Sequence, residues 1–109
     1  MAPPKEPVSI RRLAASLPGP YETRDLVTAN DSVLRVVRVE GAMDWHHHEE
    51  DQLFICWQGS FTIEVAGSAP VSLDPGDVLV IPRHTEHRTS AESLAYALMS
   101  IGAHTLARG

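Results

Sequence analysis

WHHHEEDQLFICW, residues 45–57, decides the fold, because it joins a histidine run to an alternating apolar run through a short acidic turn. The side chains of an extended strand alternate between its two faces. We therefore expect His46 and His48 to point to one side and His47 to the other. Two imidazoles on one face can bind one metal ion. The stretch predicts a strand that carries a metal site.

Two residues outside the histidine run extend this prediction. Gln52 has the same parity as His46 and His48. His87 lies far downstream and can supply a third nitrogen if its segment folds back alongside. The alternative is a solvated polar turn, since three acidic residues follow the histidines directly.

The rest of the chain predicts an all-β, antiparallel domain. Turn residues separate about eight short β-branched or alternating runs, with no convincing helix between them. Parallel strands would need crossovers of a dozen or more residues, and these are absent. Strands of this number hide their edges by closing into a barrel or jelly roll. The expected strands are 33–39, 45–48, 52–57, 61–65, 71–73, 78–81, 87–89 and 94–101.

The first 20 residues form a leader in this interpretation, and residues 21–109 form the barrel domain. Ser9 is a candidate cap for a short helix over residues 10–17, which Pro18-Gly19-Pro20 would end. Residues 1–7 carry three prolines and are expected to be mobile. The leader is therefore expected to be flexible, with a short helical or extended segment.

Composition excludes several function classes. With 109 residues the chain is expected to form one domain. Its net charge is −5, and no basic cluster exceeds the pair Arg11 and Arg12, so we expect no nucleic-acid partner. Cys56 is the only cysteine and cannot form an internal disulfide, and the N-terminus has no apolar run. We therefore expect a cytoplasmic protein that does not bind membranes.

Two groups of residues resemble the two conserved motifs of the cupin superfamily. The first motif has a glycine, His-Xaa-His, an acidic ligand and a second glycine; the second has a glycine, a proline and a histidine. The matching residues are Gly41, His46, His48, Gln52 and Gly59 for the first motif, and Gly76, Pro82 and His87 for the second. The resemblance covers roughly residues 33–101. Within it, the chain is similar to small single-domain cupins of the mannose-6-phosphate-isomerase-like type.

This resemblance implies a conical antiparallel β-barrel that holds one divalent transition metal ion, which is Fe, Mn, Ni, Cu or Zn. Carried over by position, the ligands are His46, His48, Gln52 and His87. The chain departs from the motif in three places, because Gln52 replaces a glutamate, His84 a glycine and Ala91 a frequent asparagine. A neutral amide binds a divalent ion less strongly than a carboxylate does, and it leaves the site one unit more positive.

Two function classes follow from the resemblance. One is a metal-dependent enzyme, such as a dioxygenase, isomerase or lyase, that acts on a small metabolite in the barrel cavity. His84 and Glu50 are its candidate catalytic residues, with Glu86 as a further possible base. The other class is a non-catalytic, small-ligand-binding sensor with a weak or lost metal site. Because small cupins commonly dimerise, we also expect a homodimer.

The cavity wall is less well determined by the sequence. Either Arg35 and Val37 or Val36 and Arg38 face the cavity, and an inward arginine would suit a carboxylate or phosphate on the ligand. Cys56 is expected to be a small buried hydrophobe. Further candidates for the wall are Phe54, Val80, Tyr96 and Leu98, although ordinary core is the favoured interpretation for all of them except Tyr96.

Overall fold

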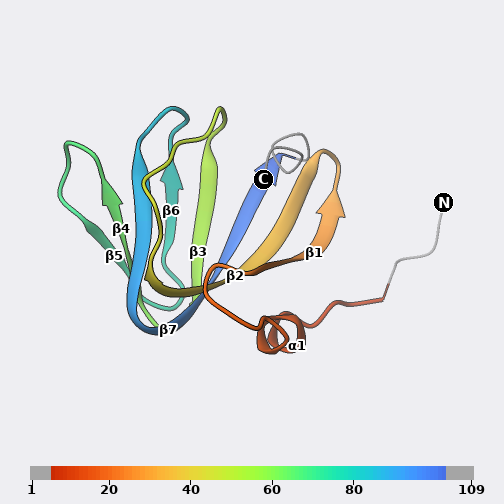
Figure 1. Ribbon diagram of the computed structural model, residues 1–109. Helices are drawn as coiled ribbons and strands as arrows, with labels where there is room; N and C mark the ends of the chain where they lie inside the picture. The colour runs from red at the N-terminus through yellow and green to blue at the C-terminus, as the bar shows by residue number, and fades with distance from the viewer. Residues whose placement is uncertain (1–5, 103–109) are drawn as a thin grey trace.

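The computed structural model describes residues 6–102; the start of the predicted leader and the end of the predicted barrel domain lie outside this range. One helix and seven antiparallel strands make up the described chain (Figure 1). The elements are α1 (Ile10–Ala15), β1 (Thr23–Ala29), β2 (Ser32–Ala42), β3 (Gln52–Gln58), β4 (Phe61–Val65), β5 (Val71–Leu73), β6 (Val78–Ile81) and β7 (His87–Gly102). The expected all-β jelly-roll class is confirmed.

The long strand β7 connects the two parts of the sheet. Its first residues pair with β4, and its second half lies between β2 and β3. The sequence analysis expected two strands here, at 87–89 and 94–101, which was wrong because the chain stays extended between them. The strand expected at 45–48 was also wrong, since only His46 makes an isolated bridge there.

Strand β1 was missed by the sequence analysis. Six of its seven residues are exposed and only Leu26 is half-buried, so the strand shows no apolar alternation. It pairs with β2 through a tight turn in which Ala29 lies opposite Ser32, and Asn30 has a φ of 54°. Asparagine tolerates this left-handed conformation, so Asn30-Asp31 was a usable hairpin signal.

Within residues 6–20, the leader contains the short helix α1, which packs on the outer face of the sheet. Ser9 caps α1, because its side-chain oxygen accepts a hydrogen bond from the backbone N–H of Arg12 at 3.2 Å. The helix is two residues shorter than expected. Ala14 of the helix and Leu17 after it are buried against Val36 and Leu98 on the outside of β2 and β7. Burial of this apolar stripe ties the leader to the barrel.

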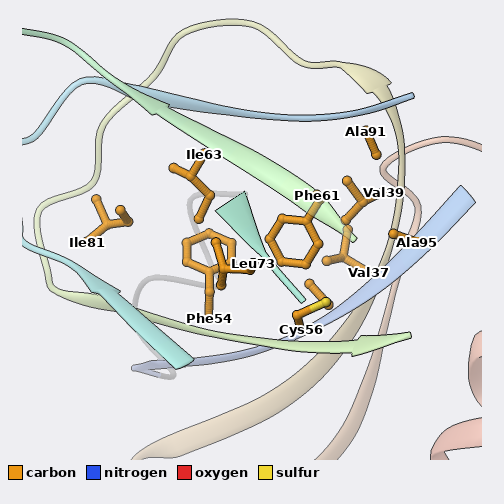
Figure 2. Close-up of a cluster of buried hydrophobic side chains, with 11 residues drawn as sticks. Val37, Val39, Phe54, Cys56, Phe61, Ile63, Leu73, Ile81, Ala91 and Ala95 are labelled. Carbon is orange, nitrogen blue, oxygen red and sulfur yellow. The ribbon is translucent and has the colours of Figure 1, made fainter. Parts of the chain in front are cut away.

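The main core fills the space between the strands (Figure 2). Its buried residues are Val37, Val39, Phe54, Cys56, Phe61, Ile63, Leu73, Ile81, Ala91, Ala95 and Ala97. Strand β2 is buried on both faces, since Val36 faces the helix and Val37 faces this core. Cys56 is a fully buried small side chain, as expected.

Three of the four candidate wall residues face elsewhere. Tyr96 and Leu98 pack in the outer cluster under α1, and Val80 is 50% exposed. The inner positions of β7 carry Ala95 and Ala97 instead, because the narrow interior accepts only small side chains there. Phe54 alone lies where it was expected.

Gly59 lies in close contact with the backbone of β7. It has a φ of 71°, and a Cβ atom there would lie 2.8 Å from the backbone oxygen of Leu94 and 2.9 Å from Cα of Ala95. Gly67 has a similar φ of 76°, but nothing lies within 4 Å of the equivalent position. It is therefore a matched control for backbone strain alone.

We expect Gly59→Ala to lower the free energy of unfolding by about 3 kcal/mol or more, since overpacking adds to the left-handed strain. Gly67→Ala should cost about 1 kcal/mol, from strain only. Urea denaturation followed by circular dichroism measures both values. Equal losses in the two variants would contradict the close approach of β7.

Candidate metal centre

A pair of backbone hydrogen bonds brings the two histidine-bearing segments together. The N–H of His46 donates to the carbonyl of His87 at 3.0 Å, and the N–H of His87 donates back to the carbonyl of His46 at 2.9 Å. A further bond runs from the N–H of His84 to the carbonyl of His48 at 2.8 Å. The side chain of Asp51 accepts from the backbone N–H of Arg83. Residues 46–51 and 83–87 are thereby held side by side.

Three imidazoles meet at this junction. The ring centroids of His46 and His87 are 4.4 Å apart, those of His46 and His48 5.0 Å, and those of His48 and His87 5.8 Å. One nitrogen from each ring lies within 4.8 Å of the others. Imidazole nitrogens bind a transition metal at about 2.0–2.1 Å, so small ring rotations suffice for one shared ion.

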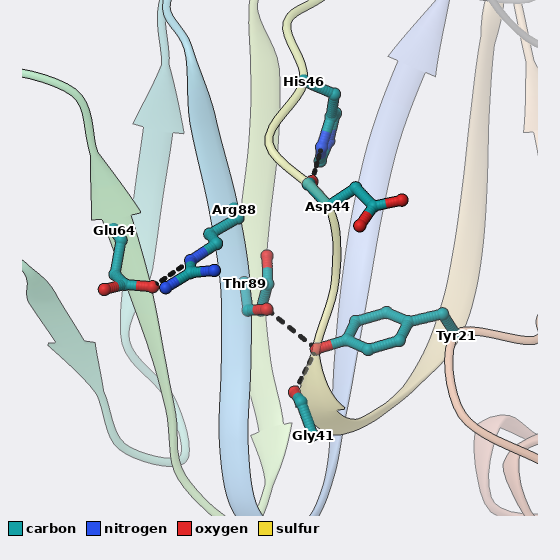
Figure 3. A network of polar contacts seen from close by, with 7 residues as sticks. All are labelled: Tyr21, Gly41, Asp44, His46, Glu64, Arg88 and Thr89. Carbon is teal, nitrogen blue, oxygen red and sulfur yellow. Dashed lines mark hydrogen bonds and ion pairs between the residues drawn. The ribbon is translucent and has the colours of Figure 1, made fainter.

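Two of these rings have a defined tautomer. Nδ1 of His46 lies 2.9 Å from the carbonyl oxygen of Asp44 (Figure 3), and Nδ1 of His87 lies 2.8 Å from that of Thr85. A carbonyl oxygen only accepts, so each Nδ1 is the protonated donor. The lone pair is then on Nε2, and such a backbone contact is how proteins orient metal-binding histidines.

Three buried polar atoms in this part of the molecule have no hydrogen-bond partner among the described residues. They are Nε2 of His48, Nε2 of His87 and Oε1 of Gln52. His87 is 1% exposed and Gln52 is 5% exposed. Buried polar atoms are nearly always partnered, because desolvation of an unpaired one is costly. Nε2 of His87 and the amide oxygen of Gln52 are electron-pair donors, and Nε2 of His48 is a third in the tautomer that carries its proton on Nδ1. A cation requires a set of this kind.

Burial also sets the charge of these rings. Desolvation lowers the pKa of His48, and the nearby His46, His87 and His47 lower it further. Desolvation likewise lowers the pKa of His87, partly offset by its bond to the Thr85 carbonyl. Both rings are therefore neutral at pH 7, which is the form that binds metal.

A cavity of about 910 Å³ opens beside His46 and His48, and His47 also borders it. Its apolar wall includes Val37, Val39, Phe54 and Met99 from the inner face of the sheet. The ring of Phe54 lies edge-on to that of His87, with 6.3 Å between centroids. The cavity is large enough for a small metabolite.

Tyr21 is a cavity residue that the sequence analysis missed. Its hydroxyl lies 2.6 Å from the carbonyl oxygen of Gly41 and 2.9 Å from that of Thr89, so it bridges β2 and β7 (Figure 3). Burial raises its pKa to about 12. No motif signals this residue, because its position depends on how the leader joins the barrel.

The structure decides between the two arginines of β2. Arg35 lines the cavity together with Val37. Arg38 points away, and its guanidinium contacts Glu40 and the carbonyl of Leu17. Of the two alternatives that the sequence left open, Arg35 and Val37 therefore face the cavity, and Val36 and Arg38 do not.

The polar residues at the mouth lie in different places. Glu50 is half-buried and lines the cavity. His84 is exposed, has a φ of 62° and pairs with Glu49 at 3.0 Å. His47 is outside the three-histidine group and pairs with Glu86 at 3.4 Å.

Trp45 does not line the cavity. Its ring packs against the guanidinium of Arg88, at 5.1 Å from the ring centroid, and Arg88 pairs with Glu64. It therefore braces the outside of β4 and β7.

Comparison with known proteins identifies the family of this chain. The cupin domain family, Cupin_2, matches residues 33–101, and the chain belongs to that family. The curated protein YdbB of Bacillus subtilis (strain 168), described as uncharacterized, is 39% identical over 61 residues, which are 55% of this chain and 54% of that protein. The chain thus spans about half the length of this curated relative.

Solved structures show the same fold. A cupin-2 domain containing protein from Shewanella frigidimarina has a TM-score of 0.82 and 24% identity, over 87% of this chain and 93% of that one. A hydroquinone 1,2-dioxygenase from Sphingomonas sp. TTNP3, with 4-hydroxybenzoate bound, has a TM-score of 0.77 and 17% identity, over 84% of this chain and 71% of that one. Among residues 6–102, no helix has the length and apolar character needed to cross a membrane.

Proposed function

We propose that this chain is a metal-binding cupin whose three histidines and Gln52 hold one divalent transition metal ion beside a cavity for a small metabolite. The observation that carries the proposal is the group of unpartnered donor atoms on His48, His87 and Gln52. Imidazole donors suit iron, manganese, nickel, copper or zinc. All four ligands are neutral, so a bound ion keeps its full charge.

The chemistry we propose is that of a metal-dependent enzyme acting on a small molecule, such as a dioxygenase, isomerase or lyase. A bound ion would supply Lewis acidity and, if it is redox-active, electron transfer. The apolar wall of Phe54, Val37 and Met99 would exclude water from the ligand. Glu50 lines the cavity and would accept or deliver a proton. His84 does not line the cavity itself but pairs with Glu49, which does, and it would assist from there. A similarly folded hydroquinone 1,2-dioxygenase makes the oxygenase branch the first to test.

Removal of a ligand should remove the metal. We expect protein purified without a tag to contain close to one metal ion per chain, and His87→Ala or His48→Ala to lower the affinity by about tenfold or more. Elemental analysis by mass spectrometry measures the metal content.

His47→Ala is the matched control, because His47 is adjacent in sequence but outside the three-histidine group. It should retain the metal. Equal loss from all three variants would contradict the assignment, and so would wild-type protein that takes up no metal on reconstitution.

A second candidate function is a non-catalytic ligand-binding sensor with a weak metal site. The neutral amide of Gln52 favours it, since an amide oxygen is a weaker ligand than a carboxylate. The enzyme would convert its bound small molecule into a product, whereas the sensor would only bind it. The enzyme hypothesis predicts that iron-loaded protein consumes oxygen with a catechol or thiol panel and that His48→Ala does not. If no oxygen is consumed, the oxygenase branch is wrong and the sensor or a redox-neutral enzyme remains.

We also propose that the chain is a cytoplasmic homodimer. Val78 and Val80 on the outer face of edge strand β6 are 58% and 50% exposed, beside the half-buried Leu53 and Ile55 of β3. Apolar side chains grouped in this way favour contact with a second subunit. Light scattering should give twice the chain mass, with a shift toward one chain mass in Val78→Glu. A single chain mass for the wild type would refute the dimer.

A further inference from the structure

We propose that the ligand of this cavity is a small organic acid, whose carboxylate is bound by Arg35 and whose opposite end lies at the three histidines. This inference rests on the proposed function and names the class of molecule that the site would take. Arg35 is a binding residue in this proposal, and Asp25 is the residue that positions it.

Asp25 holds the guanidinium of Arg35 in a fixed orientation. The two residues lie directly opposite one another in the pairing of β1 with β2. Nε of Arg35 donates to a carboxylate oxygen of Asp25 at 3.0 Å, and the Arg35 side chain is 17% exposed. Nε is the Arg35 nitrogen that hydrogen-bonds to a side chain within residues 6–102, and the terminal amino groups make no such bond there. One edge of the guanidinium therefore stays available for a bidentate contact with a carboxylate.

Arg38 shows how a structural arginine looks in the same strand. Its Nε and one terminal nitrogen contact Glu40, and its other terminal nitrogen donates to the carbonyl of Leu17. All three nitrogens are used, and the side chain lies outside the cavity. Arg35 uses one nitrogen and lines the cavity. This difference separates a ligand-binding role from a purely structural one.

The wall between Arg35 and the histidines is apolar. On the inner face, Arg35 lies opposite Met99, and Met99 lies opposite Phe54. Two strand spacings, or about 10 Å, separate the backbone of Arg35 from that of Phe54. Phe54 in turn contacts the ring of His87. A ligand that reaches from Arg35 to the histidines would therefore pass along the apolar Met99 and Phe54.

The charges favour a carboxylate over a phosphate. Asp25 neutralises part of the charge of Arg35, and Asp44, Glu49 and Glu50 also line the cavity. A single, partly neutralised guanidinium matches one negative charge. A phosphate carries nearly two charges at pH 7 and needs more donors than Arg35 offers.

The test compares acids with neutral amides of the same shape. Isothermal titration of zinc-loaded and of metal-free protein uses two pairs, 4-hydroxybenzoate with 4-hydroxybenzamide and 4-oxopentanoate with 4-oxopentanamide. We expect the acid of at least one pair to bind about tenfold more tightly than its amide, the value of one charge-assisted contact. Phenyl phosphate should bind more weakly than that acid.

Variants assign the preference to Arg35. In Arg35→Gln the acid and the amide should bind equally, whereas Arg38→Gln should retain the wild-type ratio. Arg35→Lys keeps the charge without the planar edge and should give an intermediate ratio. A thermal melt of each variant checks that it folds.

Three results would overturn the proposal: binding of neither acid, equal binding of acid and amide to the wild type, or a preference that survives in Arg35→Gln. The metal content of the same samples separates this proposal from the proposed function. Protein without metal that still prefers the acid through Arg35 refutes the metal site only. Protein with metal that shows no such preference refutes the acid ligand only.

Discussion

The two-hydrogen-bond bridge between His46 and His87 is the interaction on which the rest of the site depends. It joins segments about forty residues apart in the chain, and it places the half-buried ring of His46 against the buried ring of His87. Each of these rings is then oriented by a carbonyl two residues before it. Backbone bonds therefore fix the donor atoms without help from an acidic side chain. An arrangement held in this way presents neutral donor atoms in a desolvated place, and the metal ion that we propose there would remove the cost of the unpaired atoms.

The barrel is shaped by what each face of β7 must bury. Its inner face carries Ala95 and Ala97, which are small and leave room for the buried side chains of β2 and β3. Its outer face carries Leu98, which the leader helix covers. Because α1 buries the larger side chain of Leu98 on the outer face, the barrel interior does not have to hold it. The space that remains, together with the inward Arg35, gives a cavity with a basic group on one wall and histidines on another.

Much of this arrangement could be predicted from sequence. The failures lie where the pattern of apolar residues does not distinguish the inner face of a strand from the outer one. His46 and His48 share one group and His47 stays outside it, as alternation predicted, although the segment is not a strand. His47 nevertheless also borders the cavity. Parity failed for Val80 and Tyr96, where neighbouring positions are all apolar and either face can be the inner one. Strand β1 was missed because an exposed edge strand has no apolar periodicity. Whether Gln52 ligates and whether His84 or Glu50 acts in catalysis stay predictions.

The sequence by itself determined the fold class and the residue types of the site, since both follow from local spacing: turns between short runs, and histidines and a glutamine at fixed intervals. Only the tertiary structure decided that Arg35 rather than Arg38 faces the cavity, that Tyr21 bridges two strands, and that three donor atoms are buried without partners. The reason is that these properties belong to pairs of residues from different strands. Strand register and burial set them, and neither is encoded in the spacing of any one segment.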